Sequence, residues 1–239
     1  MNFPVMHGYI DRRILINFTA DPDVVRRIIP APFRPKVYQD KAIVGICLIR
    51  LKNIKPKGMP DFVGVSSENG AHRIAVEWDE DGQGKEGVYI PRRDTSLRLN
   101  SLVGGRIFPG KHYLAKFNVQ EAEGNYHVDF VSSDETCISI DARETEVFNP
   151  DSVFKNLENA SCFFKNGAVG YSPNDNKYEG LKLNVYDWQV QPLDVTHVKS
   201  TFFEDETLFP KGSVNFDNAL LMKRMEHEWN SISDKPRAK

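Results

Sequence analysis

Hydrophobic and polar positions alternate with a period of two in many short segments, which is the pattern of half-buried β-strands. Ile14, Ile16 and Phe18 share one face of residues 12–19, and the nearly continuous apolar run 42–51 suits a central strand buried on both faces. Further strands are expected at residues 62–67, 71–78, 88–91, 113–120, 126–132, 137–143, 182–188 and 195–203. Turn-rich breaks separate most of them, so antiparallel hairpins are expected.

Helical spacing occurs in four segments. Asp21 and Pro22 precede an apolar stripe that ends at residues 30–32, which predicts a short capped helix. Asp94 is the expected N-cap of a second helix, ending at the glycine pair 104–105. Residues 151–163 predict a third helix, and the amphipathic segment 217–229 predicts a fourth.

The predicted fold is mainly β, a β-rich α+β structure. No linker or internal repeat divides the chain, so residues 1–239 are expected to form a single domain, with 230–239 frayed. The apolar stripe of residues 217–229 is expected either to pack on the chain's own core or to form a contact in a homo-oligomer.

Composition narrows the classes of partner. The 239 residues carry a formal net charge of −2, and their Lys and Arg are scattered, which argues against a nucleic-acid partner. The arginine pairs at 12–13, 26–27 and 92–93 are expected on solvated or helix surfaces. The three cysteines lack a Cys-x-x-Cys spacing, so we expect core or half-buried thiols in a reducing cytoplasm, without disulfides. No apolar run has membrane-spanning length, so a soluble, cytoplasmic protein without a membrane partner is predicted.

Familiar catalytic and cofactor motifs are missing from the sequence. No two of the six histidines have the i, i+4 spacing of a helical metal site, so no metal is predicted. There is no Gly-x-Ser-x-Gly elbow and no glycine-rich phosphate loop after a strand, and no cofactor is expected.

With those motifs missing, the candidate chemistry is that of an amine and a carboxylate, supplied by Lys111 and Glu68. A lysine can form a Schiff base with a carbonyl compound once its pKa falls toward neutrality. Burial and a neighbouring cation, such as Arg106 or Lys116, could lower it. An ordinary surface lysine is the alternative.

Four segments carry a family resemblance: DPDVVRRIIPAPF, AIVGICLIRL, SSEN and GGRIFPGKHYLAKF. Their order resembles acetoacetate decarboxylase and its superfamily, and is more similar to a branch of that superfamily without an assigned function. The likeness spans about Arg12 to Phe203. It implies a closed antiparallel β-barrel with a few external helices, enclosing a small-molecule cavity.

The resemblance also implies roles for individual residues. Glu68 falls where the decarboxylase has a pocket glutamate, and Arg106 matches the arginine after the family's helix. Gly110 takes the place of the Schiff-base lysine, and Lys111 that of the neighbour that lowers its pKa.

Two further pocket positions differ from the family. The second pocket carboxylate falls on Cys47. The pocket arginine near the N-terminus falls on Asp11, with Arg12 and Arg13 beside it. The decarboxylase machinery is therefore expected to be incomplete.

Strand alternation separates the candidate amines. His112 and Lys116 share one face of their strand and Lys111 lies on the other. If the family's nucleophile position marks the lumen, His112 and Lys116 point inward. A one-residue register shift after the preceding proline and glycine would instead bring Lys111 inward.

The predicted function is binding of a small carbonyl or carboxylate compound, with catalysis left open. Glu68 and Asn69 would orient the ligand, and Arg106 would pair with its negative charge. Lys111, His112 or Lys116 would supply an amine or acid/base group. One alternative is a decarboxylase-like lyase that forms a Schiff base with a keto acid on Lys111 or Lys116. The other is a non-catalytic binding barrel.

Overall fold

A computed structural model describes residues 4–97, 109–175 and 177–236, and most of them lie in one mixed sheet. The strands are β1 (Met6–Ala20), β2 (Arg34–Pro35), β3 (Val37–Tyr38), β4 (Lys41–Pro56), β5 (Val65–Glu80), β6 (Gln83–Thr95), β7 (His112–Ala122), β8 (Asn125–Ser132), β9 (Cys137–Glu144), β10 (Val169–Asn174), β11 (Lys177–Val185), β12 (Gln191–Ser200) and β13 (Val214–Pro236). The helices are α1 (Pro22–Ile28), α2 (Leu157–Lys165) and the 3-10 turn η1 (Asp61–Val63). The protein is mainly β.

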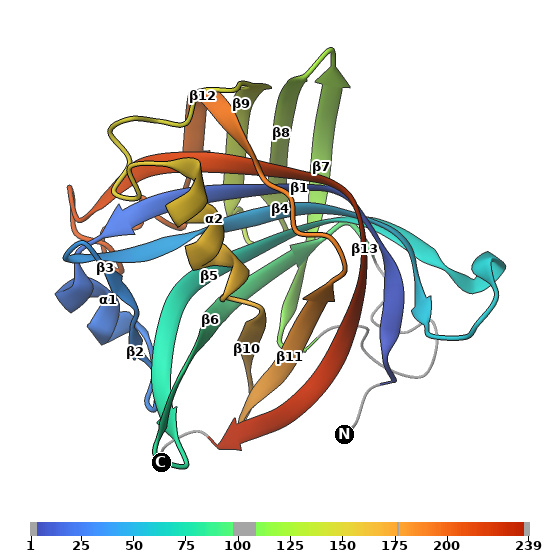
Figure 1. Cartoon of the computed structure of the whole chain (residues 1–239), viewed down its shortest axis with the longest axis horizontal. Coiled ribbons are helices and arrows are strands. Elements are labelled where there is room, and N and C mark those ends of the chain that lie inside the picture. The colour runs from blue at the N-terminus through green and yellow to red at the C-terminus, as the bar shows by residue number, and fades with distance from the viewer. Residues whose placement is uncertain (1–3, 98–108, 176, 237–239) are drawn as a thin grey trace.

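The strand order is β11-β10-β6-β7-β8-β9-β12-β13-β1-β4-β5-β2, with β3 paired to β4. Additional pairings join β5 to β6 and β11 to β13. Most pairs are antiparallel, as the hairpin breaks predict, whereas β6 pairs in parallel with β7 and β10. The sheet curves strongly, and β7, β8 and β9 extend away from the long central strands (Figure 1).

The centre of the sheet is built by β1, β4 and β5. Residues 42–48 of β4 are buried on both faces, as their unbroken apolar run predicts. Gly45 allows β1 to approach closely, because a Cβ atom there would lie 2.2 Å from the carbonyl oxygen of Ile16.

A first core fills the space between two parts of the sheet. Side chains of β1, β4 and β5 pack there against β8 and β9 and against α1. Phe130 of β8 lies over Gly70 of β5, where an added Cβ would come within 2.7 Å of its ring. The helix α1 forms as the sequence predicts: Pro22 starts it, and Asp21 caps it by accepting from the N–H of Asp23 at 2.8 Å.

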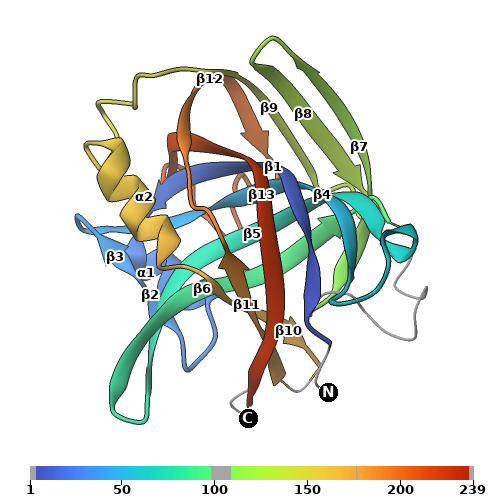
Figure 2. The same cartoon turned by 45° about the vertical axis from the view of Figure 1, so that its right-hand side comes forward.

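A second core lies on the opposite face of β1, β4 and β5. It is covered by α2, which crosses the curved sheet (Figures 1 and 2). Asn156 caps α2 by accepting from the N–H of Asn159, and Ala160, Phe163 and Phe164 form its buried side. Strand β11 and the C-terminal half of β13 complete this core.

The helix predicted at residues 217–229 is wrong, because this segment lies within β13. Residues 217–222 are buried on both faces between β1 and β12, and Met225, His227 and Trp229 then alternate with exposed or half-buried glutamates. The apolar stripe is therefore buried within the sheet. The strand also continues to Pro236 through residues predicted to be frayed.

Two other helix predictions need correction. Asp94 is no helix cap: it lies in β6 opposite Gly70, because β6 continues its pairing with β5 as far as Thr95. The rest of that predicted helix, beyond residue 97, lies outside the described residues. The helix predicted at residues 151–163 begins six residues later, at Leu157. The strand β10 was not predicted from the sequence. Within the described ranges, no helix is long and apolar enough to cross a membrane.

Candidate functional site

A cavity of about 120 Å³ lies within the second core, between the curved sheet and α2. Its walls are mainly apolar and come from β1, β4, β5, β6, β11 and β13, with Phe163 and Phe164 of α2 on the opposite side. Few polar side chains interrupt this surface. Such a cavity, with a small set of polar groups, is the usual form of a small-molecule site.

Three arginines line the cavity: Arg13 of β1, Arg73 of β5 and Arg93 of β6. None of them has a carboxylate within 4.0 Å among the residues that the structure describes. Arg73 is only 4% exposed, and its guanidinium lies 4.8 Å from the centre of the Phe164 ring. Burial lowers the pKa of Arg73, and it lowers the pKa of Arg93 to about 10.

Neutral groups hold these guanidiniums in place. Arg73 donates to Asn17 Oδ1, and Asn17 donates to Asn218 at 2.7 Å. Arg93 Nε donates to Ser172 Oγ of β10 at 3.1 Å. The Nε and Nη1 atoms of Arg13 are buried without a partner. The three positive charges are thus oriented, but no described acidic side chain lies within 4.0 Å of them. Asp94 also lines the cavity, but its carboxylate pairs with Arg92 at 2.7 Å.

Cys47 of β4 lies among these arginines. Its side chain is 3% exposed and lines the cavity, and Arg13 Nη2 lies 3.6 Å from its Sγ atom. Burial alone raises the pKa of the Cys47 thiol. The charges of Arg13 and Arg73 and their hydrogen bonds to sulfur outweigh burial, so the net shift is downward.

Strand alternation brings one arginine of the pair at residues 12–13 to the cavity and turns the other away from it. Arg13 faces the cavity, while Arg12 faces the first core and pairs with Glu68 at 2.6 Å and with Glu121. The expectation that this pair lies on a solvated surface is wrong, since Arg12 is buried.

The pair at 92–93 divides in the same way. Arg93 faces the cavity, while Arg92 pairs with Asp94 at 2.7 Å and Asp134 at 2.6 Å. Because successive strand residues point to opposite faces, an adjacent pair supplies one arginine to each side.

Two of the predicted ligand-binding residues reach the cavity. Asn69 lines it, with Nδ2 donating to Ser67 Oγ at 2.8 Å and Oδ1 accepting from Thr95 at 2.9 Å. His112 also lines it, opposite Arg93 in the β6–β7 register. Arg106 lies outside the described residues.

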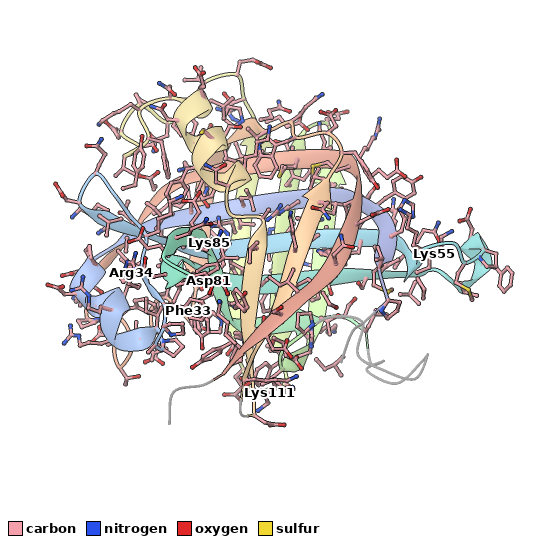
Figure 3. All side chains as sticks on the ribbon, turned by 60° about the horizontal axis from the view of Figure 1, so that its bottom comes forward. Phe33, Arg34, Lys55, Asp81, Lys85 and Lys111 are labelled. Carbon is pink, nitrogen blue, oxygen red and sulfur yellow. The ribbon has the colours of Figure 1, made fainter. Side chains whose placement is uncertain are left out.

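The structure does not bring the predicted catalytic residues to the cavity. Glu68, 16% exposed, lies on the opposite face of β5 and pairs with Arg12 and with Arg50 at 2.5 Å. Lys116 is exposed on β7, beyond the cavity, although it shares a strand face with His112. Lys111 is exposed at the periphery of the molecule (Figure 3), 5.1 Å from the Tyr113 ring centre.

Two other positions bear on amine chemistry. Gly110 has φ +84°, and a Cβ there would lie 2.5 Å from Ser172 Cβ, so the site of the family's Schiff-base lysine has no room for a side chain. Lys36 lines the cavity wall, but its ammonium pairs with Glu86 and lies 4.3 Å from the Phe163 ring centre. Across the described parts of the chain, no group of three His, Cys, Asp or Glu side chains could hold a metal ion.

Sequence reasoning missed Arg13, Arg73 and Arg93 as cavity residues. Arg13 could have been found, because the resemblance already placed a pocket arginine next to it. Cys47 stands where the resemblance implied a pocket carboxylate, and the structure places it in the cavity.

Comparison with known proteins agrees with this fold. The model of the DUF2071 family, described as "Uncharacterized conserved protein (COG2071)", matches residues 10–221. A search of the curated proteins found no match.

Several solved structures are similar. Acetoacetate decarboxylase from Legionella pneumophila has a TM-score of 0.60 at 10% identity, covering 96% of this chain and 87% of the other. An acetoacetate decarboxylase-like enzyme from Sphingomonas wittichii RW1 has a TM-score of 0.54 at 10% identity, covering 99% and 93%. The enduracididine biosynthesis enzyme MppR complexed with pyruvate has a TM-score of 0.53 at 10% identity, covering 99% and 91%. At these identities the likeness shows a shared fold.

Proposed function

The chain belongs to the DUF2071 family, whose fold is that of acetoacetate decarboxylase, and we propose that it binds a small organic anion in the arginine-lined cavity. The ligand class is a carboxylate that also carries a carbonyl group. The observation that carries this proposal is the set of three cavity arginines without a described carboxylate partner.

Electrostatics favours an anionic ligand. Burying a charge without a partner is costly, and buried cations are ordinarily paired. A carboxylate between Arg13, Arg73 and Arg93 would supply the missing negative charge through charge-assisted hydrogen bonds. The guanidiniums are already oriented, so little rearrangement would accompany binding.

The size of the cavity favours a small ligand. A cavity of roughly 150 Å³ binds benzene in another protein, and the cavity here measures about 120 Å³. A short keto acid matches this size and would place its alkyl part against the apolar walls. The complex of MppR with pyruvate, in a protein of similar fold, supports the same ligand class.

The supporting frame is a sheet that we propose is closed into a barrel. The pairings β5–β6 and β11–β13 join strands that lie far apart along the sheet order. A closed frame would hold the arginines of three different strands at fixed separations.

Binding is tested by thermal unfolding with pyruvate and acetoacetate, and with methyl pyruvate as a neutral analogue. At a ligand concentration 100 times its Kd, stabilisation is about 2.7 kcal/mol, which raises Tm by roughly 5–10 °C for a chain of this size. We expect both acids to raise Tm and the ester to have no effect. Equal shifts with acid and ester, or no shift with either acid, would contradict the proposal.

Arg13→Gln provides the matched test of the site. It should weaken binding of the acid at least tenfold, because loss of one partner of a buried charge pair costs about 2–5 kcal/mol. Arg143→Gln is the control, since Arg143 is exposed on β9 and pairs with Asp194 at 2.8 Å. Binding should be unchanged in the control.

The geometry favours binding without a Schiff base on Lys111 or Lys116, since both are exposed and neither lines the cavity. Borohydride reduction in the presence of pyruvate, followed by peptide mass spectrometry, should therefore leave both lysines unmodified. A reduced pyruvate adduct on either lysine would revive the decarboxylase-like lyase as the function.

A further inference from the structure

We propose that Cys47 is a nucleophile that adds reversibly to the carbonyl carbon of an anion bound in the cavity. This inference rests on the proposed function, because the arginines must first bring the ligand to the sulfur. It assigns a covalent step to a site that otherwise only binds.

The geometry around Cys47 combines three features. The sulfur lies at the wall of the arginine-lined cavity, in the middle of β4. Arg13 Nη2 donates to it at 3.6 Å. Arg73, the second flanking cation, is almost completely buried and has an Nε atom without a partner.

These features match the surroundings of reactive thiols. The thiolate is the nucleophile, and adjacent arginines favour it over the thiol. The direction of the Cys47 pKa agrees, since the two arginines lower it despite burial. A buried structural cysteine in a purely apolar environment would have its pKa raised instead.

The step is balanced without an oxidant or a second substrate. The thiol gives its proton to solvent, and the sulfur lone pair forms an S–C bond with the carbonyl carbon. The π electrons of the C=O bond move onto oxygen, which takes up a proton and gives a hemithioketal. Arg13 and Arg73 are the donors nearest the sulfur, and their charges would stabilise negative charge as it develops on that oxygen.

The strand arrangement makes Cys47 distinct from the other two cysteines. Cys162 is exposed on α2 and Cys137 is half-buried at the start of β9. Neither lines the cavity. They therefore serve as internal references for any difference in reactivity.

The first experiment compares alkylation of the folded protein by iodoacetate and iodoacetamide, followed by peptide mass spectrometry at each cysteine. A thiolate displaces iodide from either reagent, but only iodoacetate carries a carboxylate for the arginines. We expect the ratio of iodoacetate to iodoacetamide rates to be at least tenfold higher at Cys47 than at Cys162. A ratio at Cys47 equal to or below that at Cys162 would overturn the proposal.

Two variants show whether the arginines cause the effect. Arg13→Gln should lower the rate of iodoacetate with Cys47 at least tenfold and leave the rate at Cys162 unchanged. Arg143→Gln should change neither rate. A Cys47 rate that is insensitive to Arg13→Gln would contradict activation by the arginine.

The second experiment follows the carbonyl carbon of [2-¹³C]pyruvate by NMR, at concentrations that raise Tm. We expect a protein-dependent resonance in the tetrahedral carbon region that disappears in Cys47→Ser. Binding without this resonance overturns the covalent step and leaves the binding function intact. Absence of binding by any carboxylate in the wild-type protein would instead remove the proposed function, which separates the two failures.

Discussion

Adjacent residues on one strand have opposite electrostatic environments in this protein. Arg12 is held by two glutamates on one face of β1. On the other face, the side chain of Arg13 donates to the Cys47 sulfur and has no carboxylate within 4.0 Å among the described residues. A shift of one residue in the register of β1 would exchange them. The chemistry of the cavity therefore depends on register as much as on residue type.

Two buried histidines make stability depend on pH. Burial lowers the pKa of His72 to about 3 and that of His227 to about 4, while the unfolded chain titrates near 6.5. Below about pH 6.5 the unfolded state binds protons that the native state does not, so stability falls on acidification. Each histidine contributes about 1.36 kcal/mol per pH unit once the unfolded form is protonated.

We therefore expect the free energy of unfolding to decrease between pH 6.5 and 5. In His227→Phe the free energy of unfolding should fall less steeply with decreasing pH, because about one proton fewer is taken up on unfolding over this range. Urea unfolding at a series of pH values measures both slopes. Identical slopes in the two proteins would show that His227 is protonated in the native state.

The sequence predicted some of the site at the residue scale. The strand alternation expected after residue 111 separates His112 from Lys111, and in the structure His112 lines the cavity whereas Lys111 does not. The resemblance puts Cys47 at a pocket position, and Cys47 lines the cavity. Glu68 and Asn69 were both expected to orient the ligand, and of these two neighbours only Asn69 faces the cavity. Which of two adjacent strand residues faces the cavity depends on the strand register, and the register is determined by pairing between segments far apart in the sequence.

At the scale of elements, the sequence predicted the helix that is stabilised by neighbouring residues but not the strand that is stabilised by distant ones. The helix α1 carries its cap and proline in the sequence, and it forms where predicted. Segment 217–229 contains strong helix formers such as Leu, Met, Lys and Glu, yet β1, β11 and β12 pair with it and make it a strand. The alternation of Met225, His227 and Trp229 was the signal that favoured a strand.

The helix α2 carries a prediction about the cavity cover. Phe164 packs on Arg73 and within the second core, so Phe164→Ala should destabilise the protein by about 3–5 kcal/mol. It should also weaken binding of pyruvate, because water would enter and weaken the arginine–carboxylate attraction. Phe62→Ala, at a side chain 87% exposed, is the control and should change neither. Chemical denaturation and ligand titration measure both effects.

For the whole molecule, the two cores have different roles. The first core is almost wholly apolar, and the buried Arg12 and Arg92 are matched within the fold by Glu68 and Asp94. The second core contains Arg13, Arg73 and Arg93, which are not matched among the described residues. Sites that bind ligands are commonly less stable than the structure could otherwise be, because selection acts on function as well as stability.

The adjacent arginines test this division directly. Arg12→Gln leaves Glu68 and Glu121 with only the half-buried Arg50 as a cationic partner and should lower stability by about 1–3 kcal/mol. Arg13→Gln removes a charge that lacks a described carboxylate partner, so the ligand-free protein should keep or increase its Tm. With a bound carboxylate, the Tm of the wild-type protein should exceed that of Arg13→Gln, because the wild type gains ligand stabilisation that the variant loses. Thermal unfolding of the wild type and both variants, with and without pyruvate, measures these differences. Equal destabilisation by the two substitutions without ligand would mean that Arg13 holds the fold together as Arg12 does, and the cavity would then have no unmet charge to attract an anion.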